Sequence, residues 1–140
     1  MQLNRSAWKS WSEWKRLSEV DWKTIPSGPG VYVIAVKRKL HRALGSDEEG
    51  ILDIGQSKRL RSRLRRFWLC AGDSNLTGHM AGWRFAHHKM QKHFPLAKLR
   101  YRWRKFDSQR GAIAEEARLL REYVKHHLEN PPLNYGASWR

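Results

Sequence analysis

Two short stretches, Gly30-Val31-Tyr32 and Asp53-Ile54-Gly55, decide the fold expected for this 140-residue chain. Each lies in a run of β-branched and other apolar residues, which favours a strand. The segment between them, residues 38–50, is polar and rich in turn-forming residues, which is typical of a hairpin connection. The two stretches therefore predict neighbouring strands, with the Tyr32 hydroxyl near one end of a small sheet.

Further patterns place helices and a third strand around this hairpin. Leu60, Leu64 and Phe67 recur at helical spacing after Ser57, which can cap that helix. Residues 99–106 alternate apolar side chains with arginine, the pattern of a half-buried strand with a cationic outer face. Helices are expected over about residues 6–20, from residue 57 to a loop at 72–78, over 79–91, and from residue 108 to about 129.

These elements predict a single α+β domain over residues 1–140, with a small three-stranded, mainly antiparallel sheet flanked by helices. About residues 1–25 are rich in tryptophan and are expected to form an N-terminal helical extension, which Ser6 caps and in which Trp8 and Trp11 supply apolar contacts. The last helix is expected to turn one apolar line toward the sheet, formed by Ile113, Ala117, Leu120 and Val124.

The charge of the chain predicts an anionic partner. Lys and Arg number 28 against 13 Asp and Glu, which gives a formal net charge of +15. Residues 54–106 contain fourteen of these basic residues and a single acid, Asp73, interleaved with aromatic side chains. Basic and aromatic side chains together suit phosphate contacts and base stacking. The candidate nucleic-acid contacts are Lys58, Arg59, Arg61, Arg65, Arg66, Arg100, Arg102 and Arg104.

Several other classes of protein are disfavoured. Cys70 is the only cysteine, so no internal disulfide can form and a reducing cytoplasm is the expected compartment. No apolar run approaches the roughly 20 residues that a membrane-spanning helix needs, so no membrane partner is expected. Adjacent histidines, such as His87 and His88, diverge by roughly 100° on a helix and do not suit a shared zinc ion.

The order and spacing of several motifs resemble the GIY-YIG nuclease domain. Arg63 lies ten residues beyond Asp53, and the chain has an acidic last helix followed by Pro131-Pro132-Leu133-Asn134. Together with the two stretches quoted first, the resemblance covers about residues 26–134. It implies a three-stranded antiparallel sheet flanked by helices. It also implies divalent-metal-dependent cleavage of nucleic-acid phosphodiester bonds, usually of DNA, with Mg²⁺ or Mn²⁺ as cofactor.

The resemblance assigns catalytic roles residue by residue. Tyr32 matches the first-motif tyrosine, whose phenol, with an ordinary pKa of about 10, becomes a useful base only beside cations or a metal. Arg63 matches the arginine that grips the phosphate oxygens. Asp53 departs from the family, because it replaces the second tyrosine; a carboxylate can take a proton, bind the metal or hold Arg63. Asn134 matches the terminal asparagine and is expected to anchor the last helix. His79 suits proton transfer, phosphate binding or a purely structural place at a helix start.

The metal-binding glutamate of the family lies on a helix with apolar residues three and four positions later. Glu116 meets this condition with Leu119 and Leu120, and we take it as the metal ligand because the ligand must lie beside the core-facing side of the helix. Glu122, which is nearer in sequence to the proline pair, is the second candidate and Glu115 the third. A single carboxylate completed by phosphate and waters suits Mg²⁺.

The sequence therefore predicts a Mg²⁺-dependent endonuclease whose substrate is nucleic acid. DNA is the expected substrate, although the sequence does not distinguish DNA from RNA. The alternative is a non-catalytic basic nucleic-acid-binding module with a degraded site, which the departure at Asp53 supports. A third interpretation, a basic protein partner of RNA complexes, depends on charge alone. Because the domain is small, specificity is expected to be low or to come from a protein partner or dimerisation.

Overall fold

Four antiparallel strands form the main sheet of the computed structural model, which describes residues 10–134. The strand order is β1-β6-β2-β5, so the two strands expected from the opening motifs are neighbours and β5 forms one edge. The strands are β1 Lys15–Arg16, β2 Gly30–Val36, β5 Ile51–Ser57 and β6 Leu99–Lys105. The connection between β2 and β5 forms a separate two-stranded sheet, β3 Leu40–His41 and β4 Ser46–Asp47. The expected α+β class is confirmed, although the main sheet has one strand more than expected.

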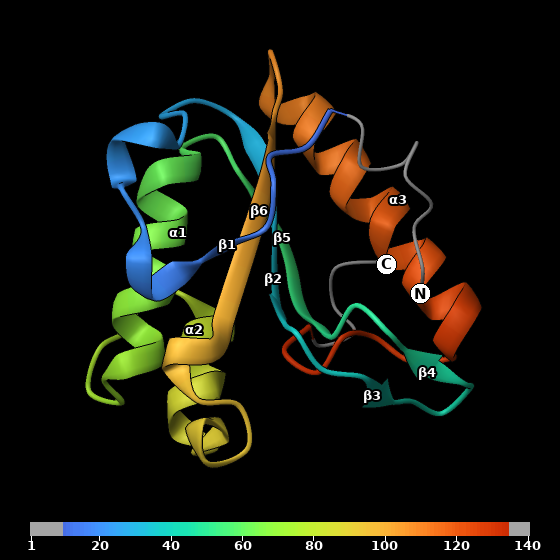
Figure 1. The fold of residues 1–140 in the computed structure, drawn as a ribbon. Coiled ribbons are helices and arrows are strands. Elements are labelled where there is room, and N and C mark those ends of the chain that lie inside the picture. The colour runs from blue at the N-terminus through green and yellow to red at the C-terminus, as the bar shows by residue number, and fades with distance from the viewer. Residues whose placement is uncertain (1–9, 135–140) are drawn as a thin grey trace.

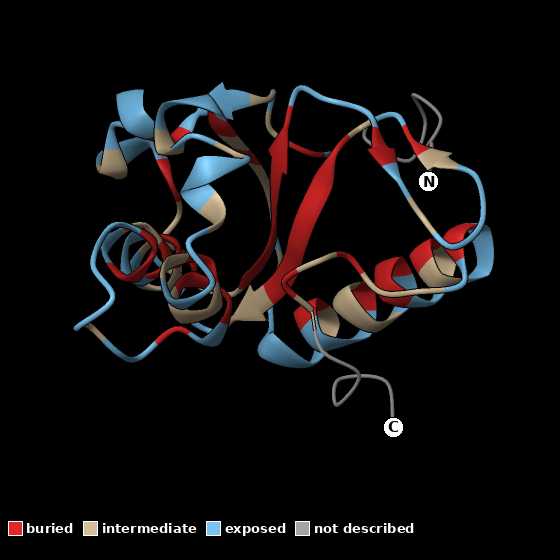
Figure 2. Cartoon of the chain, turned by 90° about the horizontal axis from the view of Figure 1, so that it is seen from below, coloured by how far each residue is buried: buried red, intermediate tan, exposed pale blue. Residues whose placement is uncertain are grey.

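Helices cover both faces of the main sheet (Figure 1). α1 (Leu60–Gly72) and α2 (Met80–His87) pack against each other on one face, and α3 (Gln109–His127) lies against β5 and β2 on the other. The strands form the buried layer between them (Figure 2). None of the helices within residues 10–134 is long and apolar enough to cross a membrane.

Alternation along β2 divides the hydrophobic interior into two clusters. Tyr32 and Ile34 belong to the cluster on the α1 side, whereas Val31 and Val33 belong to the cluster beneath α3. All seven residues of β2 are buried, as expected of a central strand with helices on both faces. The strand is therefore a rigid support for any side chain that projects from it toward the edge of the sheet.

The helix starts agree only in part with the sequence. α2 and α3 have side-chain caps: His79 Nδ1 accepts a hydrogen bond from the backbone of Gly82, and Ser108 Oγ accepts one from Gly111. α1, in contrast, begins at Leu60 without a side-chain cap. Ser57, the expected cap, is the last residue of β5. α2 ends at His87, short of the expected residue 91, and a 3₁₀ turn over Met90–Lys92 follows it.

The prediction of an N-terminal helix is wrong for the described part of that segment. Lys15 and Arg16 form β1, which pairs with Tyr101 and Arg100 of β6, and short 3₁₀ turns follow at Leu17–Glu19 and Trp22–Thr24. Backbone hydrogen-bonding groups on the outer edge of β6 need partners, and this segment supplies them. Ser6 and Trp8, which were expected to cap and pack that helix, lie outside the described residues.

The predicted inward-facing line of α3 is displaced by about one residue. Ile113 is exposed, and the buried apolar residues of the helix are Ala112, Leu119, Leu120 and Tyr123. The displacement has a polar cause. Glu115 is buried because Arg104 and Arg118 neutralise it, and the Tyr123 hydroxyl is buried because it donates to Asp47. A pattern that counts only apolar residues cannot include such paired groups.

Candidate active site

Tyr32 of β2 and Gly55 of β5 lie opposite each other in the sheet. The Tyr32 ring occupies the space that a side chain at position 55 would need. A Cβ atom on Gly55 would lie 2.3 Å from the Tyr32 hydroxyl oxygen and 2.4 Å from the adjacent ring carbon. No side chain can occupy that space while the ring stays in place. Because Gly55 is a glycine, the Tyr32 ring lies over β5 and brings its hydroxyl to the edge strand.

The Tyr32 hydroxyl meets the ring of His79, the residue that caps α2. The distance from Tyr32 Oη to His79 Nε2 is 2.7 Å. His79 Nδ1 accepts the backbone N–H of Gly82 at 3.2 Å, so the proton of the neutral ring resides on Nε2 and is donated to Tyr32. Burial, together with the positive charge of Arg63, lowers the pKa of His79 to about 3. His79 is therefore a neutral hydrogen-bond donor. It caps the start of α2 and also contacts the site, so both of its expected roles are compatible.

Asp53 lies on the same face of β5 as Gly55, two residues before it, and its side chain is only 3% exposed. Burial raises the pKa of Asp53 to about 6, and the nearby Tyr32 hydroxyl and Arg63 guanidinium partly offset that rise. Its Oδ2 atom is buried and accepts no hydrogen bond from any described residue. Such an acceptor is costly unless something binds it, so this carboxylate oxygen is available to a ligand.

The Tyr32 phenol is held in its neutral form. Burial raises the pKa of Tyr32 well above its ordinary value, the negative charge of Asp53 raises it further, and Arg63 opposes both. The hydroxyl is thus a weak base by itself. Any role in removing a proton from water requires that Tyr32 pass its own proton onward.

Two arginines supply positive charge to the site. Arg63, on α1, donates from Nη1 to the backbone carbonyl of Gly78 at 2.9 Å, which fixes it beside the site. Arg84, on α2, donates from Nη1 to the carbonyl of Leu133 at 2.9 Å and lowers the pKa of Asp53. The Arg63 position agrees with the prediction from its spacing, whereas Arg84 did not figure among the predicted site residues.

Only one of the three candidate glutamates lies at the site. Glu116 lines the same pocket as Asp53 and Arg63, whereas Glu115 is bound between Arg104 and Arg118 and Glu122 contacts His126. Burial raises the pKa of Glu116 to about 7, and the negative charge of Asp53 contributes to that rise. The choice of Glu116 by its place on the helix is consistent with this geometry.

Asn134 attaches the end of the described chain to the edge of β5. Its Oδ1 accepts the backbone N–H of Ile54 and its Nδ2 donates to the Ile54 carbonyl, both at 2.9 Å. The Leu133 N–H donates to the carbonyl of Leu52 at 2.8 Å. The side-chain amide therefore imitates a neighbouring strand, which confirms the expected anchoring of the segment after the last helix and closes one side of the pocket.

These groups surround one open pocket of about 360 Å³ at the edge of β5. It collects side chains from both layers of helices, because Arg63, His79 and Arg84 come from the α1 and α2 side and Glu116 from α3. Its predicted residues are Tyr32, Asp53, Arg63, His79, Glu116 and Asn134. Within residues 10–134 no group of three or more His, Cys, Asp or Glu side chains is placed to hold a metal ion.

The predicted nucleic-acid contacts fall into two sets. Lys58, Arg59, Arg65 and Arg66 are exposed around α1, as expected. Arg61 differs, because its Nε donates to the carbonyl of Ile25 at 2.8 Å and the side chain is partly buried. Arg61 therefore has a structural role that its exposed neighbours lack.

The arginines of β6 are less open than their alternation indicated. Arg100 and Arg102 both stack on Trp14, with guanidinium carbons 4.5 and 4.6 Å from the ring centre. Arg104 donates to Glu115 at 2.9 Å. Trp14 of the N-terminal segment and Glu115 of α3 lie against this face, and all three arginines are half-buried. The expected half-buried strand is present, but its arginines are partly covered by these neighbours.

Comparison with family models, curated proteins and solved structures finds no match to this chain.

Proposed function

We propose that this protein is a divalent-metal-dependent endonuclease of the GIY-YIG type that hydrolyses phosphodiester bonds of nucleic acid, with DNA as the expected substrate. One observation carries the proposal: the Tyr32 hydroxyl, the Arg63 guanidinium and the Glu116 carboxylate come from three different elements and line one pocket. A hydroxyl that can relay a proton, a cation for the phosphate and a carboxylate for a metal are the groups that such hydrolysis needs.

The two carboxylates of the pocket fit a divalent cation. Asp53 and Glu116 each have a raised pKa, and the charge of Asp53 contributes to the rise at Glu116. A cation between two such groups would remove the cost of ionising them together. Two carboxylates leave most coordination positions to water and phosphate oxygen, which suits Mg²⁺ or Mn²⁺. Glu116 would hold the ion with the negative charge of Asp53 beside it, and the bound ion would act as a Lewis acid beside the phosphate oxygens.

Asp53 gives the buried tyrosine a proton acceptor. His79 Nε2–H occupies one side of the Tyr32 oxygen, so the hydroxyl hydrogen is able to point to the Asp53 carboxylate. Water would lose a proton to the Tyr32 oxygen as Tyr32 passes its own proton to the Asp53 carboxylate. The hydrogen bond from His79 would stabilise negative charge on the phenol during this transfer. In this scheme the carboxylate does not copy the family's second tyrosine but assists the first.

Arg63 would hold the phosphate as negative charge develops on it. Its Nη1 is engaged with Gly78, which leaves the rest of the planar guanidinium to bind oxygen atoms in a fixed geometry. The fixed geometry matters because a preorganised donor lowers the barrier more than a mobile charge does.

The second candidate is a basic nucleic-acid-binding module that does not cut. The raised pKa of Tyr32 favours it, because a protonated buried phenol without an effective relay would be inert. Binding without cleavage would then depend on the exposed basic residues around α1.

Incubation with supercoiled plasmid separates the two candidates. Wild-type protein should nick or linearise the plasmid with Mg²⁺ or Mn²⁺ and not with EDTA. Glu116→Gln should abolish cleavage with little loss of DNA affinity, whereas Glu122→Gln, on the same helix but outside the pocket, should cut normally. Absence of cleavage by the wild-type protein with retained DNA binding would contradict the endonuclease and favour the binding module. Cleavage that survives Glu116→Gln would refute the assigned metal ligand.

A further inference from the structure

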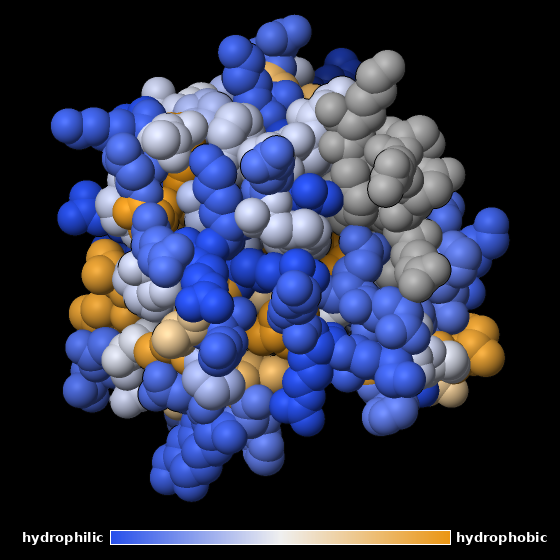
Figure 3. Space-filling view, in the orientation of Figure 1, coloured by the Kyte–Doolittle hydropathy of each residue, from blue (hydrophilic) through white to orange (hydrophobic). Residues whose placement is uncertain are grey.

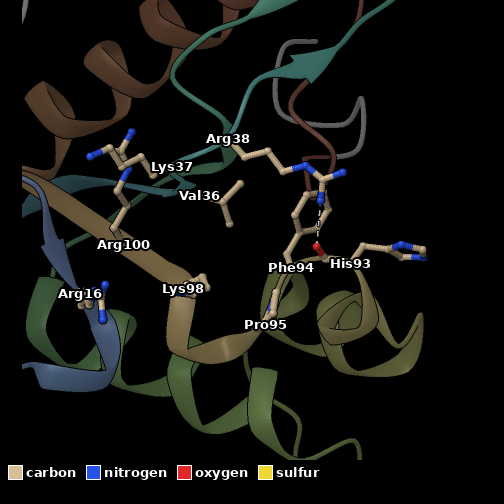
Figure 4. A pocket seen from close by; sticks show the side chains of 9 residues that line it. All are labelled: Arg16, Val36, Lys37, Arg38, His93, Phe94, Pro95, Lys98 and Arg100. Carbon is tan, nitrogen blue, oxygen red and sulfur yellow. Dashed lines mark hydrogen bonds between the residues drawn. The ribbon is translucent and has the colours of Figure 1, made fainter.

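A second cavity lies at the far end of β2 from Tyr32. It measures about 490 Å³ and opens where β2 ends and β6 begins (Figure 4). Five cationic side chains line it: Arg16, Lys37, Arg38, Lys98 and Arg100. No carboxylate is among its described lining residues. We call this cavity the basic pocket.

Three separate parts of the chain bring these charges together. Arg16 belongs to β1, Lys37 and Arg38 follow β2, and Lys98 and Arg100 lie at the start of β6. β1 pairs antiparallel with β6, and the face of the molecule on which they lie is covered mostly by hydrophilic side chains (Figure 3). Like charges repel when a fold gathers them around one cavity. The negative charge of Glu49 acts on Arg100 from outside the lining, but no acidic residue is among the described lining residues themselves. Such a cavity is suited to an anion.

The pocket also has a partly rigid, apolar wall. Arg38 donates from Nη1 to the carbonyl of His93 at 3.0 Å, and its guanidinium carbon lies 5.4 Å from the centre of the Phe94 ring. Figure 4 shows Arg38 reaching over Phe94, with Val36 between these residues and Arg100. Arg38 is thus held in position, while Lys37 and Lys98 are exposed and able to adapt. A fixed guanidinium, two adaptable ammonium groups and an apolar wall match a phosphate that carries a sugar and base.

We propose that the basic pocket is a second phosphate-binding site, separate from the candidate active site, which takes a backbone phosphate of nucleic acid. The proposal relies on nucleic acid being the partner, as the proposed function does, but not on cleavage. The candidate active site lies at the edge strand β5, whereas the basic pocket lies beside β1 and β6. The protein would therefore hold its substrate at a position remote from the bond that it cuts.

Charge reversal of the two exposed lysines tests this site. Lys37→Glu with Lys98→Glu changes the net charge by four, and so does the control pair Lys23→Glu with Lys125→Glu, whose residues are exposed and line neither pocket. Affinity for a labelled duplex or single-stranded oligonucleotide is measured by anisotropy in EDTA, so the result does not depend on nuclease activity. The pocket pair should weaken binding at least tenfold, and the control pair less than threefold. The slope of log affinity against log salt should also become shallower by about 0.7–0.9 for each phosphate that the variant no longer binds.

Equal weakening by the two pairs would overturn the proposal, because net charge alone would then explain binding. Amide shifts in NMR spectra supply a second measurement on the wild-type protein. The oligonucleotide should shift the amides of residues 37–38, 93–94 and 96–98, whereas inorganic phosphate and a mononucleotide should bind there at least a hundredfold more weakly. Equal affinity for the mononucleotide would make the ligand a small phosphate compound and refute the assignment to nucleic acid. Selective weakening by the pocket pair in a protein that never cuts plasmid would uphold the basic pocket and reject only the endonuclease.

Discussion

Replacing Glu116 by glutamine should stabilise the folded protein above neutral pH. The pKa of Glu116 is raised from an ordinary 4.5 to about 7, first by burial and then by Asp53. A folded-state pKa above the unfolded value means that the protonated carboxyl favours folding and that this contribution is lost as pH rises through about 7. Glutamine resembles the protonated form at every pH, so the variant avoids the loss.

The magnitude follows from the pKa difference. Each pKa unit corresponds to about 1.4 kcal/mol, so full burial would give roughly 3 kcal/mol at pH 8. Glu116 is only half-buried and solvent screens its charge, which reduces the expected gain to about 1–2 kcal/mol. A gain of that size raises the melting temperature by about 3–8 °C in a domain of this length.

Thermal or urea unfolding at several pH values checks this result. The gain of Glu116→Gln should be largest at pH 8 and above, and should shrink to about a quarter at pH 5, where both proteins carry a largely uncharged group at this position in the folded state. Glu122→Gln is the matched control and should show no comparable pH dependence. A stability difference that is independent of pH, or a loss of stability at pH 8, would refute the electrostatic reasoning.

Addition of Mg²⁺ extends the same experiment to the proposed cation site. An ion present at ten times its dissociation constant stabilises the folded state by about 1.4 kcal/mol. The wild-type protein should gain stability with Mg²⁺ at pH 8, and Glu116→Gln should gain much less. An equal gain in both would place the ion elsewhere.

Three further substitutions address the site one interaction at a time. Gly55→Ala should displace the Tyr32 ring and lower the free energy of unfolding by about 1–3 kcal/mol. The same substitution should be nearly neutral in a Tyr32→Ala background. Equal costs in both backgrounds would show that the clash is not with the ring. Arg63→Lys should raise the barrier of single-turnover cleavage by about 2–4 kcal/mol with little change in DNA affinity. Arg65→Lys, on the exposed side of α1, is the control and should change neither quantity. Similar small effects of both substitutions would refute the assigned role of Arg63. Asn134→Ala removes two hydrogen bonds to Ile54 and should lower the free energy of unfolding by about 1–3 kcal/mol, which denaturant unfolding measures and which an unchanged midpoint would contradict.

The sequence was sufficient for the strands that carry the site. The polar, turn-rich segment of residues 38–50 between the runs around Tyr32 and Gly55 predicted a hairpin, and β2 and β5 are antiparallel neighbours. Helical periodicity likewise placed Arg63 on the right side of α1, next to the stripe of Leu60 and Leu64. Position beside an apolar stripe is a local property, so it can be inferred without knowledge of the tertiary structure.

Tertiary partners account for what the sequence did not predict. The segment around Lys15 became a strand because β6 offered an unpaired edge, and no local propensity records such an edge. Arg84 reached the site because the carbonyl of Leu133 receives it, although 49 residues separate the two in sequence. The only signal for Arg84 in the sequence was that a basic residue lay on the helix predicted over residues 79–91, near a predicted site with several carboxylates. Trp14 likewise covers Arg100 and Arg102 through a tertiary contact that the local sequence pattern does not indicate.

The proposed function depends most on Asp53, where the sequence departs from the GIY-YIG pattern that it otherwise resembles. A tyrosine at this position would add a second buried phenol, whereas Asp53 adds a buried carboxylate with one oxygen that no described residue binds. Burying two carboxylates in one pocket raises the pKa of both and destabilises the fold at neutral pH. Neutral residues in place of Asp53 and Glu116 would avoid this destabilisation. The Tyr32 hydroxyl is hydrogen-bonded to His79, and the absence of a side chain at Gly55 leaves room for its ring. Costly buried charges and fixed polar groups of this kind are typical of functional sites. These features support the proposed endonuclease over the proposed binding module.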